Sequence, residues 1–293
     1  MNNKNPPKTS LRPLWDAILK VYKVFAEICD KHGLRYCADC GTALGAVRHG
    51  GFIPWDDDMD IQMPRPDYEK FVEIAPRELP TGYAWLDRTN CPEYDNPFGK
   101  IVVADKGIVE RVAHETGLSL GEGIFVDVFP LDGYPDSRLG VLYRRIQNIL
   151  IEMGLKMSEQ GKGHTLKSRL ANVLGHLVCP RKYRIASHLE QCDIYVKRAK
   201  KIPFGSTSMC VSIGTAHYSD DKPFPLKFFG TPHKIPFENT TMPVQEDVKG
   251  YLTYIFGDFM KLPPEDKRVG THGNVRITPW RFGPLGIPPK NPS

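Results

Sequence analysis

The most constraining feature of this 293-residue sequence is an acidic run that leads directly into an apolar segment. Four of the five residues from 56 to 60 are aspartates, although aspartate is depleted in β-strands. Polar and apolar residues nevertheless alternate from 57 to 63, and this alternation predicts a half-buried strand. Because side chains alternate across a strand, we expect Asp56, Asp58 and Asp60 on one face and Met59 and Ile61 on the other.

Such a row of carboxylates requires compensation. Two carboxylates about 5 Å apart repel each other by roughly 3 kcal/mol at an effective dielectric constant near 20. This repulsion destabilises the fold or raises a pKa unless a cation lies between the groups. Ligands that are all oxygen atoms favour Mg²⁺ or Mn²⁺ over Zn²⁺. The segment therefore predicts a divalent metal site, and the alternative is a solvated acidic edge strand.

A second motif lies some fifteen residues earlier, where Gly41 and Thr42 follow a short strand-like segment and precede a helix-like one. Backbone N–H groups at a helix N-terminus bind anions such as phosphate. Gly41 permits close backbone approach and Thr42 offers a hydroxyl, although Gly-Thr is also an ordinary helix cap. Arg48 is either a bidentate phosphate contact or part of a surface salt bridge. A phosphate site beside a divalent cation is what phosphoryl transfer requires.

A third carboxylate is expected from another strand. Asp127 is isolated among the apolar residues of the segment 123–131, where an unpartnered charge is costly. We assign Asp127 as a third metal ligand or as a general base. Asp132 is followed by Gly133 and is predicted to be a turn residue.

The remaining periodicity predicts a mixed α/β core with a helical insertion. Helices are expected over 11–33, from Gly41 to Gly50, after a cap at Asp67, over 137–157 and over 248–256, and strands over 34–39, 57–63, 83–87, 99–105 and 123–129. The insertion is placed at 137–205, with extended tails at 1–10 and 273–293. Its segment 162–201 has ten lysines and arginines against two acidic residues, which indicates either a solvated helical face or a surface for an anionic glycan or membrane.

Composition narrows the class of protein. The formal net charge of +5 does not require nucleic acid, and none is expected as a partner. Seven scattered cysteines predict free thiols in a reducing compartment, and Cys37 and Cys40 are either a redox or zinc pair or two strand cysteines. The sequence has no apolar run long enough to span a membrane and no apolar segment near Met1. We therefore expect a cytoplasmic protein.

These motifs together resemble the LicD family of phosphotransferases, which includes bacterial phosphocholine transferases and, more distantly, the fukutin-related enzymes. The resemblance covers roughly residues 14–272, and we take 11–272 as a single catalytic domain. It is carried by four stretches, namely 41–61 with its Gly-Thr and Asp-rich parts, Pro64-Arg65-Pro66-Asp67-Tyr68, Val126-Asp127-Val128-Phe129-Pro130-Leu131-Asp132-Gly133, and 254–264.

The resemblance implies a nucleotidyltransferase-like fold with a central mixed β-sheet flanked by helices. It implies transfer, assisted by Mg²⁺ (or Mn²⁺), of a phosphorylated alcohol, most simply phosphocholine, from a CDP-activated donor. The acceptor is then a hydroxyl of a glycan or lipid-linked glycan, such as lipopolysaccharide or a teichoic-acid precursor. A lipid-linked acceptor also implies peripheral contact with the inner face of the membrane.

Carried over to this sequence, the family pattern assigns the metal to Asp58 and Asp60, with Asp127 as the later strand aspartate. Gly41 and Thr42 lie near the donor phosphates, and Lys100 and Arg48 are candidate electrostatic stabilisers of the leaving group. The sequence leaves two other functions open, a nucleotidyltransferase that uses a nucleoside triphosphate and an inactive glycan- or nucleotide-binding module. Aromatic residues at 85, 94 and 98 are either core or part of a cage for a quaternary ammonium group.

Overall fold

The computed structural model describes residues 10–94, 96–116, 123–159, 179–184, 186–214 and 222–268. In this part of the chain the helices are α1 (Arg12–His32), α2 (Cys40–His49), α3 (Arg65–Glu78), α4 (Lys106–Thr116), α5 (Arg138–Glu159), α7 (Arg181–Arg184), α8 (His188–Ala199) and α9 (Val248–Phe256). The strands are β1 (Cys37–Ala38), β2 (Asp60–Pro64), β3 (Tyr83–Leu86), β4 (Gly99–Val103), β5 (Phe125–Tyr134), β6 (Met209–Ser212), β7 (Phe224–Pro225), β8 (His233–Phe237) and β9 (Thr240–Val244).

The described strands form one mixed sheet and a separate hairpin. The sheet has the order β1-β2-β5-β4-β3, and β6 pairs with both β5 and β7. Only the β2–β5 pairing is parallel; β8 and β9 form the antiparallel hairpin. The ten-residue strand β5 therefore contacts three other strands and organises the sheet. This mixed α/β architecture agrees with the expected nucleotidyltransferase-like fold class.

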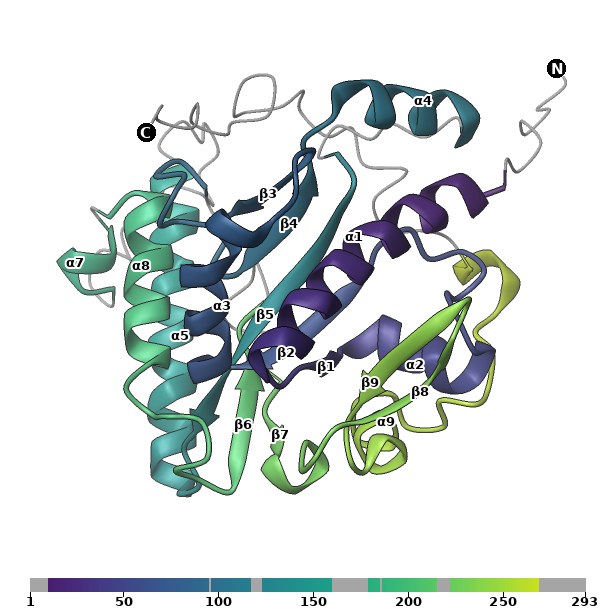
Figure 1. Cartoon of the computed structure of the whole chain (residues 1–293). Helices are drawn as coiled ribbons and strands as arrows, with labels where there is room; N and C mark the ends of the chain where they lie inside the picture. The colour runs from purple at the N-terminus through teal and green to yellow at the C-terminus, as the bar shows by residue number, and fades with distance from the viewer. Residues whose placement is uncertain are drawn as a thin grey trace, which may run out of the picture.

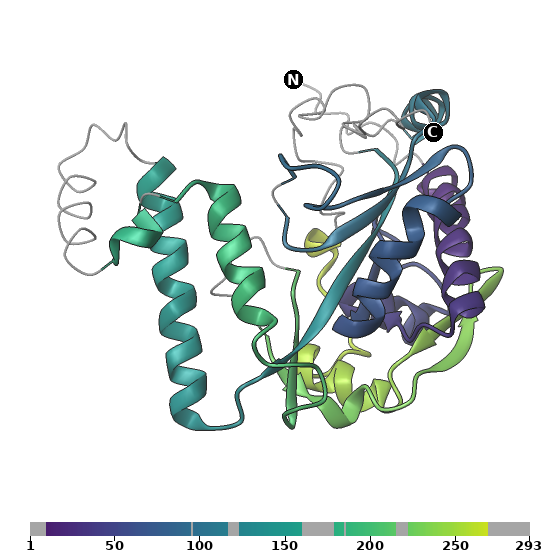
Figure 2. The same ribbon diagram turned by 60° about the vertical axis from the view of Figure 1, so that its left-hand side comes forward.

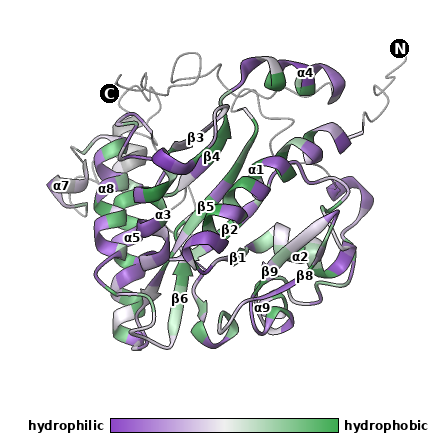
Figure 3. Ribbon diagram, in the orientation of Figure 1, coloured by the Kyte–Doolittle hydropathy of each residue, from purple (hydrophilic) through white to green (hydrophobic). Residues whose placement is uncertain are grey.

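Helices cover the two faces of the sheet unequally. Helix α1 crosses one face (Figure 1), and its apolar side joins Ile61, Ile101, Val126 and Val128 in the main hydrophobic core. In Figure 2, α1 and α3 lie on one side of the sheet, whereas α5 and α8 stand on the other. Figure 3 shows that β4 and β5 are largely hydrophobic between these helices.

The predicted helical insertion lies between β5 and β6. It comprises α5, α7 and α8 and has its own small core around Tyr134, Ile151 and Tyr195. Glu190 and Ser187 form a reciprocal capping box at the start of α8, which fixes where this helix begins. Much of the basic segment 162–201, and most of both predicted tails, lies outside the described residues. The limits of the domain and of the insertion stay predictions.

The helix predictions for α1, α2, α5 and α9 are confirmed, but several details are wrong. The expected strand at 34–39 is reduced to Cys37–Ala38. Asp67 does not cap α3, because this helix begins at Arg65 with its proline in the first turn. The predicted strand at 57–63 begins only at Asp60, since a turn in which the Asp56 N–H donates to the Ile53 carbonyl precedes it.

Asp132 is not a turn residue, contrary to the sequence-based expectation. It lies within β5 and is fully buried, and its carboxylate accepts two hydrogen bonds from the Arg65 guanidinium at 2.9 and 2.5 Å. Arg65 is the first residue of α3, so this bidentate ion pair joins α3 to the central strand. The Asp-Gly signal therefore predicted a turn where the chain continues as a strand.

Removal of one partner of this pair is expected to leave an uncompensated buried charge. We predict that Asp132→Asn lowers the free energy of unfolding by about 3–5 kcal/mol, measured by urea denaturation. The matched control is Arg35→Met, which removes the exposed ion pair of Arg35 with Asp67 and is expected to cost less than about 1 kcal/mol. Equal losses for the two variants would contradict the structural role of the buried pair.

Candidate active site

The register of the strands brings charged residues into one row across the sheet. Asp60 of β2 lies opposite Asp127 of β5, and Asp127 lies opposite Lys100 of β4. Directly paired residues project from the same face, so these three side chains share one face. The alternate residues Ile61, Ile101 and Val126 belong to the core under α1. The charged row therefore faces away from α1.

Asp39 extends the row by one strand. Its N–H donates to the Asp60 carbonyl at 2.9 Å, which continues the antiparallel pairing of β1 with β2. The carboxylate is buried and accepts hydrogen bonds from the Cys40 N–H and from the hydroxyls of Ser212 and Tyr251. Sequence reasoning gave Asp39 no role. Its place directly after the short strand β1, two residues before the Gly-Thr motif, was the signal that could have found it.

Asp60 lies in an environment that opposes its ionisation. Burial raises its pKa well above the usual range, and the negative charges of Asp58, Asp127, Asp39 and Asp56 raise it further. Four neighbouring carboxylates thus act on one half-buried carboxyl group. A cation at this point would relieve the repulsion.

The acidic run itself folds as a loop, so the prediction that Asp56 and Asp58 share a strand face with Asp60 is wrong. Carboxylate oxygens of Asp56, Asp57 and Asp58 nevertheless lie within 4.8 Å of one another, and all three side chains are half-buried. The Trp15 indole N–H donates to the Asp56 carbonyl at 2.8 Å and fixes the start of the loop. A loop places consecutive aspartates together in a way that strand alternation does not allow.

Asp127 and Lys100 form a buried ion pair. The Lys100 ammonium lies 3.2 Å from the Asp127 carboxylate and 3.7 Å from the centre of the Phe125 ring, and both charged side chains are only 9% exposed. Lys100 therefore supplies one positive charge, at the end of the row opposite to Asp39. The structure thus brings the predicted residues Asp60, Asp127 and Lys100 together.

The predicted anion site lies at the start of α2. A Cβ atom on Gly41 would lie 3.1 Å from the Asp56 carboxylate, so the first turn of α2 closely approaches the acidic loop. The Thr42 hydroxyl oxygen accepts a hydrogen bond from the Asp60 N–H at 2.9 Å and holds β2 against α2. Gly41 and Thr42 therefore lie beside the carboxylates, and Thr42 has a structural contact that the sequence did not predict.

Arg48 lies at the other end of α2. Its guanidinium donates to the Phe259 carbonyl at 2.8 Å, and burial lowers its pKa. This hydrogen bond joins α2 to the segment after α9. It is neither the phosphate contact nor the surface salt bridge that the sequence predicts for Arg48. The structure does not bring Arg48 to the charged row in the way that it brings Lys100.

Two further expectations concern groups close to the site. Cys37 lies in β1, whereas Cys40 begins α2, and burial raises the pKa of both thiols well above the usual value. A raised pKa disfavours the thiolate that redox or zinc chemistry requires. All seven cysteines are free, as predicted. Trp85, Tyr94 and Phe98 are each less than 8% exposed and belong to the protein interior rather than to an open aromatic cage.

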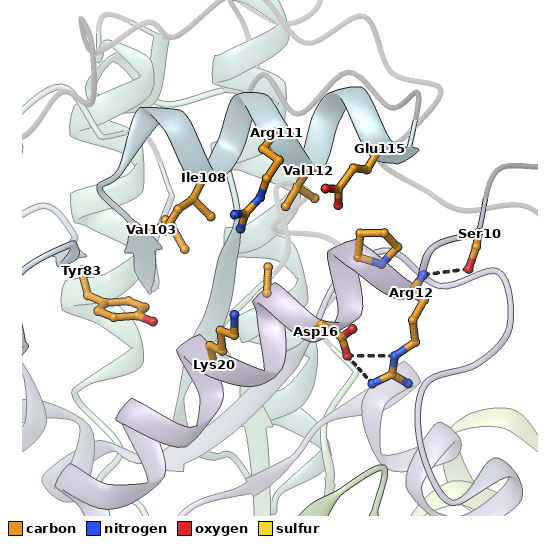
Figure 4. Close-up of a pocket in the computed structure, with 12 residues that line it drawn as sticks. Ser10, Arg12, Asp16, Lys20, Tyr83, Val103, Ile108, Arg111, Val112 and Glu115 are labelled. Atoms are coloured by element: carbon orange, nitrogen blue, oxygen red, sulfur yellow. Dashed lines mark hydrogen bonds and ion pairs between the residues drawn. The ribbon is translucent and has the colours of Figure 1, made fainter.

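A cavity of about 520 Å³ lies elsewhere, between α1 and α4. Figure 4 shows Arg12, Lys20, Arg111 and Glu115 around it, together with apolar side chains of α4 and β4. Its strand residues Tyr83 and Val103 are two of the residues that pack toward the core under α1. This cavity therefore belongs to the face opposite the charged row.

The residues present fit a divalent cation of the Mg²⁺ class. All the candidate ligand atoms around Asp60 are carboxylate oxygens, which Mg²⁺ and Mn²⁺ prefer. Asp58, Asp127, Asp39 and Asp56 all raise the pKa of Asp60, and a divalent cation among these oxygens would lower it. Among the described residues, the carboxylate oxygens close enough to one another to share an ion are those of Asp56, Asp57 and Asp58. The assignment of the metal to Asp58, Asp60 and Asp127 stays a prediction.

Comparisons with known proteins identify this region. Residues 33–132 match the family model described as LicD/FKTN/FKRP, nucleotidyltransferase domain, and this segment runs from the end of α1 to Asp132. A lipopolysaccharide cholinephosphotransferase, LicD, of Haemophilus influenzae is 25% identical over 279 residues, which covers 90% of this chain and 97% of that protein. An uncharacterised protein of Rickettsia typhi is 39% identical over 67 residues, or 23% of this chain and 22% of its own.

The raised pKa of Asp60 predicts how stability depends on pH in the presence of a chelator. The native state keeps a proton on Asp60 that the unfolded state releases, so the free energy of unfolding should fall as pH rises above about 4. The slope for this one group is at most about 1.4 kcal/mol per pH unit, and the loss ends once native Asp60 is ionised. Urea denaturation across pH measures this fall, and millimolar Mg²⁺ should reverse it at the upper end.

Asp60→Asn should remove this part of the pH dependence. The control Asp266→Asn changes an exposed aspartate outside the site and should leave the wild-type profile intact. A wild-type profile that is flat between the ordinary aspartate pKa and neutral pH would show that the carboxylates do not repel one another as inferred.

Proposed function

We propose that this LicD-family phosphotransferase moves phosphocholine from CDP-choline to a hydroxyl of a cell-surface glycan, with Mg²⁺ (or Mn²⁺) as its cofactor. The observation that carries the proposal is the crowding of carboxylates at Asp60 beside the first turn of α2. The Haemophilus influenzae relative, named for phosphocholine transfer to lipopolysaccharide, supports the choice of alcohol and of a glycan acceptor. A teichoic-acid precursor or another lipid-linked glycan also offers a hydroxyl and is an alternative acceptor.

Asp58 and Asp60 would hold the cation, with Asp127 as a third ligand or as the general base. A bound divalent ion would neutralise charge on the donor phosphates and on the departing CMP. The side chain of Asp60 needs this positive charge most, because burial and four carboxylates oppose its ionisation. The Asp39 carboxylate is held in place by hydrogen bonds from Ser212 and Tyr251, and its negative charge would lie on the β1 side of the site.

The start of α2 would receive the donor phosphates. Backbone N–H groups in the first turn of a helix have no partner within the helix, and the helix dipole favours anions there. Gly41 allows a close approach, while Thr42 keeps this turn next to Asp60 through its hydrogen bond. Arg48, at the opposite end of α2, would act mainly by holding the helix in place.

The acceptor hydroxyl oxygen would attack the phosphorus that carries choline, and the bond from this phosphorus to the CMP oxygen would break. Asp127 would take the hydroxyl proton in the role of general base. Lys100 orients the Asp127 carboxylate from 3.2 Å and adds positive charge beside the developing negative charge on the leaving group. Both groups belong to adjacent strands, so their relative position is fixed by the sheet.

The proposal is tested by incubation of the protein with Mg²⁺ and CDP-choline, CDP-ribitol or CDP-glycerol, with CMP release as the readout. We expect CMP from CDP-choline, and we expect Asp60→Asn to lower its rate at least 100-fold because the cation is lost. The control Asp266→Asn should retain the wild-type rate. Release of pyrophosphate from CTP instead would favour a nucleotidyltransferase, and no turnover together with no Mg²⁺ binding by calorimetry would favour a binding module.

The role of Lys100 gives a separate prediction. Lys100→Met keeps most of the side-chain volume but removes the charge next to Asp127, so kcat should fall more than 10-fold while KM for the donor changes little. Lys106→Met removes an exposed lysine of α4 and serves as the control. A rise in KM with unchanged kcat would instead assign Lys100 to ground-state binding of the donor.

A further inference from the structure

Helix α5 has an outward face of unusual composition. The described residues include nine large hydrophobic side chains that are exposed, and five of them lie on this one helix. The exposed fractions on α5 are 80% for Leu139, 54% for Leu142, 64% for Tyr143, 46% for Ile146 and 49% for Ile149. Isolated exposed hydrophobic residues are ordinary, but a contiguous set marks an interaction site.

These five residues form one stripe, which we call the α5 face. Their spacing over the first half of the helix, mostly three or four residues, places them on the same side. The stripe is about 15 Å long, from Leu139 to Ile149, at 1.5 Å per residue. It therefore forms a continuous apolar surface rather than a scatter of single side chains.

The side of α5 that packs against the protein combines polar residues with Ile151 of the insertion core. Arg144 and Asn148 are at most 3% exposed, and Arg198 of α8 donates a hydrogen bond to the Asn148 side chain. A surface helix of a globular protein normally has one apolar stripe, which faces the core, whereas α5 has a second apolar stripe that faces solvent. The α5 face therefore requires a covering partner.

Charge identifies the kind of partner. Residues 138–151 contain no aspartate or glutamate, and Arg138 and Arg145 are exposed along one edge of the α5 face. Arg181 of α7, a helix that packs on α5, is also exposed. A second copy of this chain, placed symmetrically on the stripe, would bring the Arg145 side chains of both copies together. An anionic phospholipid surface offers complementary charge and an apolar layer beneath it.

We propose that the α5 face docks on an anionic phospholipid membrane, with its apolar residues at the boundary between headgroups and acyl chains. This inference rests on the proposed function, because it places the enzyme where a lipid-linked acceptor is found. No helix in the described part of the chain is long and apolar enough to cross a membrane, so α5 would lie on the surface. Helices α5 and α8 also stand on the side of the sheet away from α1 (Figure 2), as does the charged row.

The test is sedimentation of the full-length protein with vesicles. One set contains phosphatidylglycerol and phosphatidylcholine, and the other contains phosphatidylcholine alone. We expect binding to the anionic vesicles, a loss of at least 10-fold in affinity for Ile146→Glu, and a smaller loss for Arg145→Glu. Met260→Glu and Arg111→Glu make the same changes at exposed positions elsewhere and should bind as the wild type does.

Failure of the wild type to bind anionic vesicles, or equal binding by Ile146→Glu and the wild type, would overturn the inference. Light scattering tests the competing occupant, a second copy of this chain. If the wild type is a dimer and Ile146→Glu is a monomer, the α5 face is a dimer interface and the membrane proposal is wrong. CMP release from soluble CDP-choline should be the same in Ile146→Glu and the wild type. Turnover without vesicle binding would therefore reject the docking surface and leave the proposed function intact.

Discussion

Repulsion among carboxylates is the constraint on which the site depends. Pairing of β1, β2 and β5 places Asp39, Asp60 and Asp127 in adjacent positions, and the acidic loop adds Asp56 and Asp58. The protein compensates each end of this row differently. Lys100 neutralises Asp127, whereas two hydroxyls and a backbone N–H hold Asp39. The centre at Asp60, where four carboxylates raise the pKa, is where the proposed cation would bind, and this supports phosphoryl transfer over a purely structural role.

The same logic separates the structural charges from the functional ones. Asp132 is as buried as any residue of the row, but its bidentate contact with Arg65 fully matches its charge. A matched ion pair of this kind fixes α3 on the sheet and leaves no need for a ligand. Asp60, in contrast, is surrounded by charges of its own sign. The two aspartates therefore differ above all in the sign of the charge beside them.

Sequence patterns predicted the main helices and indicated a candidate metal site, because both signals are local. The period of apolar residues defined α1 and α9, and the density of aspartates indicated the metal site. Features that depend on partners distant in sequence were missed. Asp132 accepts hydrogen bonds from Arg65, sixty-seven residues away, and Asp39 accepts one from Tyr251, near the end of the described chain. The start of β2 at Asp60 was also missed, because Pro54 and Trp55 produce a turn that alternation alone does not reveal.

One continuous strand joins the two halves of this architecture. Strand β5 carries Asp127 near its beginning, and it ends at Tyr134 in the small core of the helical insertion. Seven residues of extended chain separate these positions by about 23 Å, and pairing with β2, β4 or β6 along this length leaves the strand little freedom to stretch or shear. A tilt of the insertion relative to the sheet must therefore bend β5 or break its pairing with β6. The orientation of the outer helices and the geometry of the reacting groups are mechanically linked through this single rigid element.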